Sequence, residues 1–266
     1  MPEQRSSEER EARRVTFDDI PAAYDAARPS YRPEVIDDVL GLGGFSPGSH
    51  VAEIGCGTGQ ATIPLTDRGL VMTCVEMGEN MAAFARAKFA PYPSISVVNA
   101  PFETWDAGAA EYDGVVSFAS FHWIDPAVRF VKAASVLREG GSLVVVTGRH
   151  VRAPDGDPFF EASIPVYRVL DGGAEPAPGL DQVTDLSAEF EASGAFGPVR
   201  MRRHTIEITR SVDEHLALIG TYSPQLLLDD ATRQWLFARL REVAAELGQT
   251  TIRQTMVQIV HAAVRL

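Results

Sequence analysis

Several features that define whole protein classes are scarce or missing in this chain. Only two of its 266 residues are cysteine, Cys56 and Cys74, which argues against a disulfide scaffold. Its six histidines show no metal-ligand spacing and no Cys/His cluster occurs, so we expect no bound metal. No apolar run is long enough to span a bilayer, and the polar start, Met1 to Arg14, lacks the apolar centre of a signal peptide. These absences predict a cytoplasmic protein with no membrane partner.

Positive charge is also in short supply. The 24 lysines and arginines face 36 acidic residues, which gives a formal net charge of −12 at pH 7. Binding to nucleic acid needs a basic surface, so we expect no nucleic-acid partner, although a local basic patch at Arg200, Arg202 and Arg203 stays open. The length suits one α/β domain with additions. No pattern in the sequence indicates an oligomeric state.

What the chain does have is a glycine-rich turn in residues 51–62. A short apolar run contains the acid Glu53, and glycines follow at alternate positions, Gly55, Gly57 and Gly59. Glycine accepts positive φ and lets a ligand approach the backbone closely. A helix-like pattern begins directly afterwards, so its exposed N–H groups would face whatever lies above the turn. The stretch predicts a buried parallel strand, a tight turn and the start of a helix.

Strand-like and helix-like segments alternate on both sides of this turn. Two short helices are predicted first, at 17–28 and 33–42. Strands are then predicted at 50–55, 71–76, 95–98, 112–118 and 142–147, with helices at 59–68, 79–90 and 126–137. This alternation is typical of a doubly wound α/β sheet. After Thr147 the pattern becomes less regular, with helices predicted at 159–170, 186–195, 211–220 and 229–247 and strands at 199–208 and 251–264.

The glycine turn resembles motif I of the class I methyltransferases that use S-adenosylmethionine (SAM). Glu53, Gly55, Gly57 and Gly59 match its pattern of an acid, any residue and Gly-x-Gly-x-Gly. A nicotinamide-binding turn would instead have glycine where Gln60 stands. The turn at Leu137–Gly141, with a leucine, a basic residue and two glycines, also resembles this family. The run Phe121-His122-Trp123 is similar to one in a subgroup that methylates small molecules.

The resemblance implies a mostly parallel seven-stranded sheet whose last strand is antiparallel. Residues 1–14 are expected to form a flexible charged arm, and residues 15–266 a single methyltransferase domain. Within that domain we expect an N-terminal cap at 15–45 and substrate-covering insertions at 150–183 and 209–249, the second lying between the last two strands.

The same resemblance implies residues that bind SAM or its product S-adenosylhomocysteine. The backbone at Gly55–Gly59, Cys56 included, would hold the amino-acid end, with Glu53 near the ammonium and Arg28 near the carboxylate. Glu76 would accept hydrogen bonds from the ribose hydroxyls, and Met77 either packs on adenine or fills the core. The adenine edge is assigned to Asn99, Ala100 and Phe102. Because ligands sit at the carboxyl ends of parallel strands, Ser117 and Phe118 would face the methyl group.

The expected activity is methyl transfer from SAM to a small-molecule acceptor by in-line displacement, at a carboxylate or hydroxyl oxygen. Tyr24 and Tyr222 are candidates for positioning the acceptor. His122 is either a general base or a structural histidine, since a carboxylate acceptor needs no base. Two alternatives stay open: a non-catalytic SAM-binding protein, and, with less support, an NAD(P)-dependent oxidoreductase.

Overall fold

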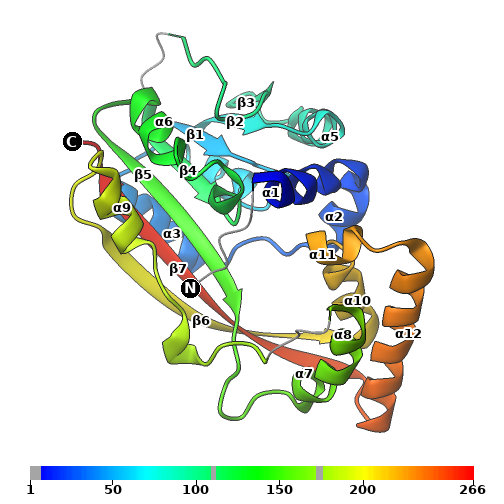
Figure 1. Ribbon diagram of the computed structural model, residues 1–266. Helices are drawn as coiled ribbons and strands as arrows, with labels where there is room; N and C mark the ends of the chain where they lie inside the picture. The colour runs from blue at the N-terminus through cyan, green and yellow to red at the C-terminus, as the bar shows by residue number, and fades with distance from the viewer. Residues whose placement is uncertain (1–6, 109–111, 172–175) are drawn as a thin grey trace. The chain divides into compact units, whose positions relative to one another are not determined.

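The computed structural model describes residues 7–108, 112–171 and 176–266 (Figure 1). The chain divides into two compact units. Unit 1 comprises residues 1–147, 185–203 and 259–266, and unit 2 comprises residues 148–184 and 204–258. The strand order of the sheet is β3-β2-β1-β4-β5-β7-β6. This order confirms the predicted doubly wound sheet of seven strands, and the predicted helical insertion between the last two strands is also present.

The parallel part of the sheet belongs to unit 1. Its strands are β1 (His50–Ile54), β2 (Val71–Glu76), β3 (Ile95–Asn99), β4 (Tyr112–Phe118) and the first part of β5 (Leu137–His150). Each neighbouring pair from β3 to β5 is parallel. Nearly continuous burial along β4 is the pattern of a strand covered on both faces. All these strands therefore end at one edge of the sheet, which is where the glycine turn lies.

The last strand of the chain, β7, runs antiparallel to both of its neighbours, β5 and β6. β6 spans Arg200–Ser211 and β7 spans Thr251–Val264. In unit 1 the Arg265 N–H donates to the Gly141 carbonyl, and in unit 2 the Val151 N–H donates to the Thr255 carbonyl. Later residues of β5 therefore pair with earlier residues of β7, so the two strands run in opposite directions. Residues of β5, β6 and β7 belong to both units.

Helices cover both faces of the unit 1 sheet. A cluster of buried aromatic and aliphatic side chains lies under α6 (Arg129–Val136) and α9 (Ser187–Ser193), with Phe130, Phe190 and Phe196 packed edge to face. Figure 1 shows α3 (Pro33–Gly43) on the opposite side of the strands from α6. α4 (Thr62–Thr66) contacts β2, and α5 (Glu79–Phe89) contacts β2 and β3.

Three short N-terminal elements precede α3: α1 (Ser7–Arg14), a 3₁₀ turn η1 (Val15–Asp19) and α2 (Pro21–Ala27). Asp18 of η1 accepts a hydrogen bond from the Met81 N–H at 2.8 Å, so it caps α5 from outside that helix. A Cβ on Gly78, at the N-cap of α5, would lie 2.3 Å from the Asp18 carboxylate. Asp25 of α2 also pairs with Lys88 of α5 at 2.5 Å. These contacts attach the N-terminal segment to α5.

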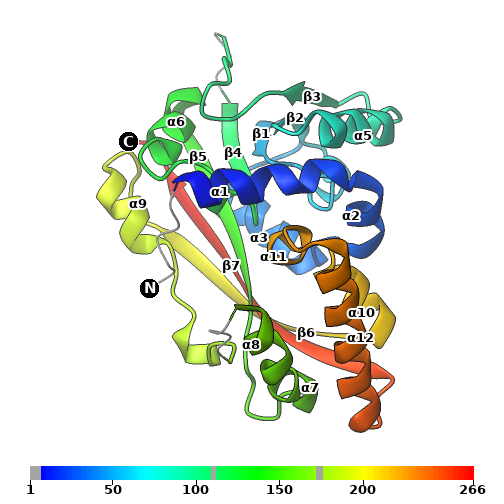
Figure 2. The same cartoon turned by 45° about the vertical axis from the view of Figure 1, so that its right-hand side comes forward.

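Unit 2 has a smaller core of its own. Its helices are α7 (Pro158–Ala162), α8 (Ile164–Asp171), α10 (Val212–Ile219), α11 (Ser223–Leu226) and α12 (Asp230–Glu246), with the 3₁₀ turn η3 at Leu180–Gln182. Figure 2 shows α12 beside α8 and α10, which agrees with their contacts. Phe159, Leu216, Leu236 and Leu240 are each 1% exposed or less and pack in this core. The predicted insertions at 150–183 and 209–249 lie within unit 2.

The structure corrects four details of the sequence expectations. Residues 7–14 form the helix α1 rather than a flexible arm, because Arg14 forms an ion pair with Glu103 at 2.6 Å; residues 1–6 lie outside the described part. The helix expected at 59–68 is the shorter α4. β5 begins at Leu137 instead of 142, since Gly140 takes a positive φ of 73° within it. The helix expected at 159–170 is divided at Ser163, two residues before Pro165.

Candidate cofactor-binding site

The glycine turn after β1 uses all three of its glycines for backbone reasons. Gly55, Gly57 and Gly59 have φ values of 63°, 54° and 94°. A Cβ on Gly55 would lie 2.8 Å from the Ser120 Cβ, and one on Gly59 would lie 2.4 Å from the Phe89 ring. A Cβ on Gly57 would have no contact closer than 3.5 Å. The outer two glycines therefore allow close packing of the turn, whereas Gly57 has only ordinary contacts around it.

Glu53 lies in the strand directly before the turn and is almost completely buried, at 1% exposed. Its carboxylate accepts a hydrogen bond from the Thr62 hydroxyl at 2.6 Å. Burial raises the pKa of Glu53 to about 8; the Thr62 hydrogen bond opposes this rise and the charge of Glu76 adds to it. A cation placed beside Glu53 would restore its ionised form.

This pKa predicts a pH dependence of stability that Glu53→Gln removes. The folded protein keeps the Glu53 proton up to about pH 8, whereas the unfolded chain releases it near 4.5. The Glu53 contribution to the free energy of unfolding is therefore full below pH 4.5 and declines as the pH rises to about 8. Urea unfolding at about pH 5 and about pH 8 should show a smaller loss in Glu53→Gln than in the wild type. Equal losses in the two proteins would contradict the assignment.

Glu76 ends β2 and joins the glycine turn to the next loop. Its Oε2 accepts from the Gly57 N–H at 3.0 Å, and its Oε1 accepts from the Gly78 N–H at 3.2 Å. Burial raises the pKa of Glu76, while these backbone hydrogen bonds act to lower it. At 8% exposed, the residue keeps a small accessible edge. A carboxylate has about four acceptor positions, and backbone N–H groups, that of Met77 among them, take most of these, so only part of this capacity remains for a ligand.

The loop after β3 presents one polar side chain with a defined orientation. The Asn99 Nδ2 donates to the carbonyls of Glu76 at 2.9 Å and Met77 at 3.0 Å, which leaves its Oδ1 as an acceptor on the other side. Asn99 is exposed, and Met77 and Ala100 are half-buried. Phe102 differs from them, because it is 4% exposed and packs against Trp105 in the core.

The end of β4 carries a strained residue that the sequence pattern did not reveal. Among the described residues, Ala119 is the one non-glycine position with positive φ, at 51°. The Ser120 hydroxyl donates to the Ile54 carbonyl and is 2.6 Å from the Ser117 hydroxyl. Ser117 is fully buried, and Phe118 packs on Tyr31 with ring centroids 4.7 Å apart. Ser120 therefore ties the β4 end to the β1 end, beside Gly55.

The N-terminal segment lies over the glycine turn. The Tyr24 ring covers Gly57, since it would lie 3.5 Å from a Cβ placed there. The Arg28 guanidinium lies 4.8 Å from the Tyr24 ring centroid. Tyr31 donates its N–H to the Gln60 carbonyl at 3.4 Å, and burial raises its pKa. The structure thus brings Tyr24 and Arg28 to the same turn as Glu53 and Glu76.

The remaining candidate site residues are His122, Cys56 and Tyr222. His122 is exposed in the 3₁₀ turn η2 (Phe121–Trp123), and its ring lies 4.5 Å from that of Trp123. The ring centroids of Trp123 and Phe17 lie 5.8 Å apart, and this contact links the turn to the N-terminal segment. Cys56 is buried, at 4% exposed, so its thiol is not presented to a ligand. Tyr222 belongs to unit 2, where it packs at the edge of the small core.

No cluster of three or more His, Cys, Asp or Glu side chains suited to a metal ion occurs in the residues that the structure describes. A search of the same residues found no helix with the length and apolar character needed to cross a membrane.

The sheet order, the glycine turn after β1 and the acid at the end of β2 together define a class I, Rossmann-like fold. Residues 52–145 match the model of a family described as a methyltransferase domain. The stretch from β1 into β5 is therefore similar to a methyltransferase domain, the family that motif I indicated.

Similar proteins are known from sequence and from structure. An uncharacterized methyltransferase of Mycobacterium tuberculosis is 33% identical over 132 residues, 50% of this chain and 51% of that protein. The chain thus spans about half the length of such curated relatives. A putative type II methyltransferase from Anaeromyxobacter dehalogenans has a TM-score of 0.59 at 21% identity, over 89% of this chain and 97% of that one.

A third similar protein was solved with ligands. It is phosphoethanolamine N-methyltransferase 2 of Haemonchus contortus, in complex with phosphomonomethylethanolamine and S-adenosylhomocysteine. Its TM-score is 0.56 at 15% identity, over 99% of this chain and 61% of that chain. At such identities the likeness establishes the fold and no more.

Proposed function

We propose that this protein is an enzyme that transfers a methyl group from SAM to a small-molecule acceptor. The observation that carries the proposal is the Glu76 carboxylate beside the glycine turn, where its Oε2 accepts a hydrogen bond from the Gly57 N–H. Glu53 lies directly before the same turn, and the Arg28 guanidinium lies 4.8 Å from the ring centroid of Tyr24, which packs at Gly57. The two acids and the guanidinium match the ammonium, hydroxyls and carboxylate of SAM. The methyltransferases among its relatives and structural neighbours support the same activity.

Each residue has a proposed role in holding the cofactor. Arg28 binds the methionine carboxylate, and Glu53 the ammonium, whose charge favours ionised Glu53. Glu76 accepts from the ribose hydroxyls in the charge-assisted hydrogen bonds that are among the stronger kinds in proteins. The backbone of Gly55–Gly59, including Cys56, surrounds the methionine part.

The adenine end has weaker anchors. We propose that the Asn99 Oδ1 accepts from the adenine amine, with Met77 and Ala100 against the ring, because these three keep accessible surface. Phe102 would support this loop from the core side, and Ser117 and Phe118 would fix the shape of the β4 end.

Bound SAM supplies an electrophilic methyl group, and the protein's task is to align the acceptor with it and exclude water. We propose a carboxylate or hydroxyl acceptor. His122 would act as base toward a hydroxyl, and Tyr24 and Tyr222 would position the acceptor.

The function is tested by transfer of isotopically labelled methyl from SAM to a metabolite extract, followed by mass identification of the product. We expect a labelled ester or methyl ether, together with saturable binding of SAM and none of NAD in calorimetry. SAM binding without transfer to any acceptor would favour the non-catalytic alternative. Saturable NAD binding without SAM binding would overturn the proposal.

Two substitutions should separate cofactor binding from acceptor positioning. Arg28→Ala should weaken SAM binding at least about tenfold, the scale for a hydrogen bond to a charged group. Tyr222→Phe should lower kcat/KM for the acceptor about 2- to 12-fold, the scale for one hydroxyl hydrogen bond, and leave SAM affinity within about twofold. The half-buried Tyr92 provides a matched control, since Tyr92→Phe should change neither quantity. Unchanged turnover in Tyr222→Phe would remove Tyr222 from the acceptor site.

A further inference from the structure

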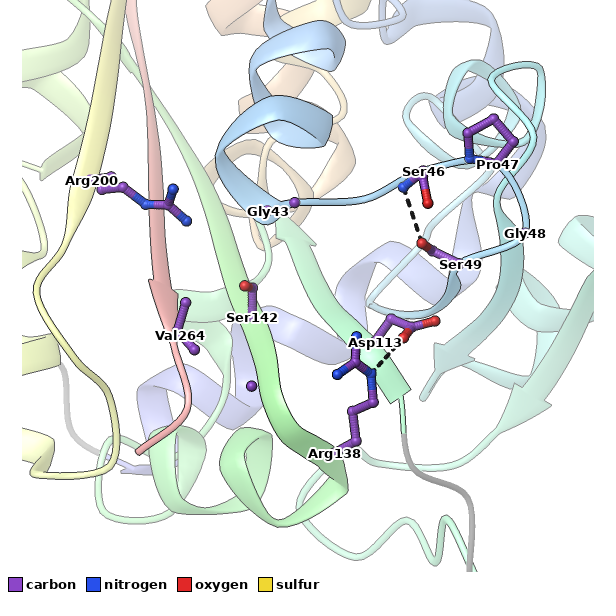
Figure 3. A pocket seen from close by; sticks show the side chains of 12 residues that line it. Gly43, Ser46, Pro47, Gly48, Ser49, Asp113, Arg138, Ser142, Arg200 and Val264 are labelled. Atoms are coloured by element: carbon purple, nitrogen blue, oxygen red, sulfur yellow. Dashed lines mark hydrogen bonds and ion pairs between the residues drawn. The ribbon is translucent and has the colours of Figure 1, made fainter.

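A cavity of about 480 Å³ opens in unit 1 at the starts of the parallel strands. Its walls come from the turn at 43–49, from Asp113 at the start of β4, and from the first residues of β5. Arg200 of β6 and Val264 of β7 complete it (Figure 3). The volume lies in the range of small-molecule sites.

This cavity is separate from the proposed SAM site. Gly55–Gly59 follow the carboxyl end of β1, whereas Ser49 lies just before its amino end. The five residues of β1 place these two ends about 17 Å apart, at roughly 3.3 Å per residue. A ligand in the cavity would therefore be a different molecule from the cofactor.

Positive charge gathers at the cavity although the whole chain is acidic. Arg138 and Arg200 line it, and Figure 3 shows them on opposite sides of Ser142. Arg265, next to Val264, donates to the Leu137 carbonyl at the same edge. Among the lining residues the one acid is Asp113.

Asp113 is already neutralised by its own partners. It accepts from the Arg138 Nε at 2.6 Å and from the His50 N–H at 2.7 Å. Burial acts to raise its pKa, but these hydrogen bonds outweigh burial and hold the pKa below its usual value. The Arg138 Nη1 also donates to the Glu139 carbonyl at 3.0 Å, so the guanidinium is fixed in orientation and its Nη2 is the nitrogen left for a ligand.

Arg200 and Ser142 supply the other polar groups. The Arg200 Nη2 donates to the Leu42 carbonyl at 2.6 Å, which anchors the side chain and leaves its other N–H donors for a ligand. Ser142 is 3% exposed, yet it lines the cavity. In the described part of the chain, the hydroxyl of Ser142 takes no hydrogen bond from another residue.

We propose that this cavity binds a small dianion, with one anionic group on Arg200 and the other on Arg138, and with the Ser142 hydroxyl between them. Two guanidiniums on opposite walls suit a molecule with an anionic group at each end, because each keeps N–H donors for a phosphate or carboxylate oxygen. A diphosphate and a dicarboxylate share this chemistry. The site lies outside the methyl-transfer chemistry and does not depend on it.

The test is calorimetric titration of the full chain with pyrophosphate and, separately, with succinate. We expect saturable binding of at least one, and the tighter of the two identifies the anionic group. Arg200→Gln should weaken that binding at least tenfold. Arg202→Gln is the matched control, because Arg202 is exposed on the same strand and does not line the cavity.

The result must also be independent of the cofactor. Saturating S-adenosylhomocysteine should leave pyrophosphate or succinate affinity unchanged, since the two sites are separate. Competition between them, equal loss in Arg200→Gln and Arg202→Gln, or no binding of either anion at millimolar concentration would each overturn the proposal. Arg200→Lys, which keeps the charge without the planar fork, should lose less than Arg200→Gln.

Discussion

Glu76→Ala is expected to weaken binding of S-adenosylhomocysteine about 10- to 150-fold, which corresponds to roughly 1.5–3 kcal/mol. The substitution removes the proposed acceptor of both ribose hydroxyls. It also leaves the Gly57 and Gly78 N–H groups without their carboxylate partner, so we expect the glycine turn to change its conformation as well. Both effects act in the same direction on affinity.

Glu76→Gln separates these effects, because its amide oxygen can still accept from one N–H while the negative charge is lost. We expect an intermediate affinity, measured by calorimetry beside a thermal melt that checks folding. Glu79→Ala is the control, since Glu79 is exposed at the start of α5 and should leave affinity unchanged. A folded Glu76→Ala protein with wild-type affinity would show that the ribose assignment is wrong.

Gly59→Ala is expected to destabilise the protein by about 2–5 kcal/mol. The backbone at φ 94° costs an L-residue about 1–2 kcal/mol, and overpacking typically adds about 1–3 kcal/mol. The added Cβ would lie 2.4 Å from the Phe89 ring, and Phe89 is 3% exposed and held in the core. Either α5 or the glycine turn must therefore move.

Gly194→Ala provides the matched comparison. Gly194 also has positive φ, at 61°, but a Cβ there meets nothing within 4 Å. We expect Gly194→Ala to lower the free energy of unfolding only by the cost of the backbone conformation, about 1–2 kcal/mol, as measured by urea unfolding. The difference between the two variants measures the contact with Phe89. Equal losses would mean that Phe89 moves aside freely and that Gly59 serves the backbone alone.

The sequence predicted the sheet and its glycine turn well because their signals are local. An apolar run, a glycine series and an acid at the next strand end depend on near neighbours, so the amino-acid pattern alone was enough to group Glu53, Gly57 and Glu76. The helical start escaped prediction because residues 7–14 are polar apart from Ala12, and what orders them includes the distant pair Arg14–Glu103.

Other parts of the site depend on contacts that no local pattern records. Positive φ at Ala119 and the approach of Ser120 to Gly55 arise where β1 and β4 meet, 66 residues apart in the chain for the Ser120–Ile54 bond. Asp18 caps α5 from 63 residues away, where the sequence shows only Gly78 at the cap. The division into two units was also hidden, since β5, β6 and β7 continue through it without a linker.

The position of β7 has a consequence for how the chain acquires its structure during synthesis. β7 is the last strand in the sequence, yet it lies between β5 and β6 in the sheet. The five strands β1 to β5 can pair with one another as soon as they leave the ribosome. β6 has no neighbouring strand until β7 is synthesised, after the helices α10, α11 and α12. Until then β5 and β6 both present unpaired backbone, the state most open to wrong association. A chaperone that binds the nascent chain would therefore find its main target in β5 and β6, while residues 212–250 are being synthesised.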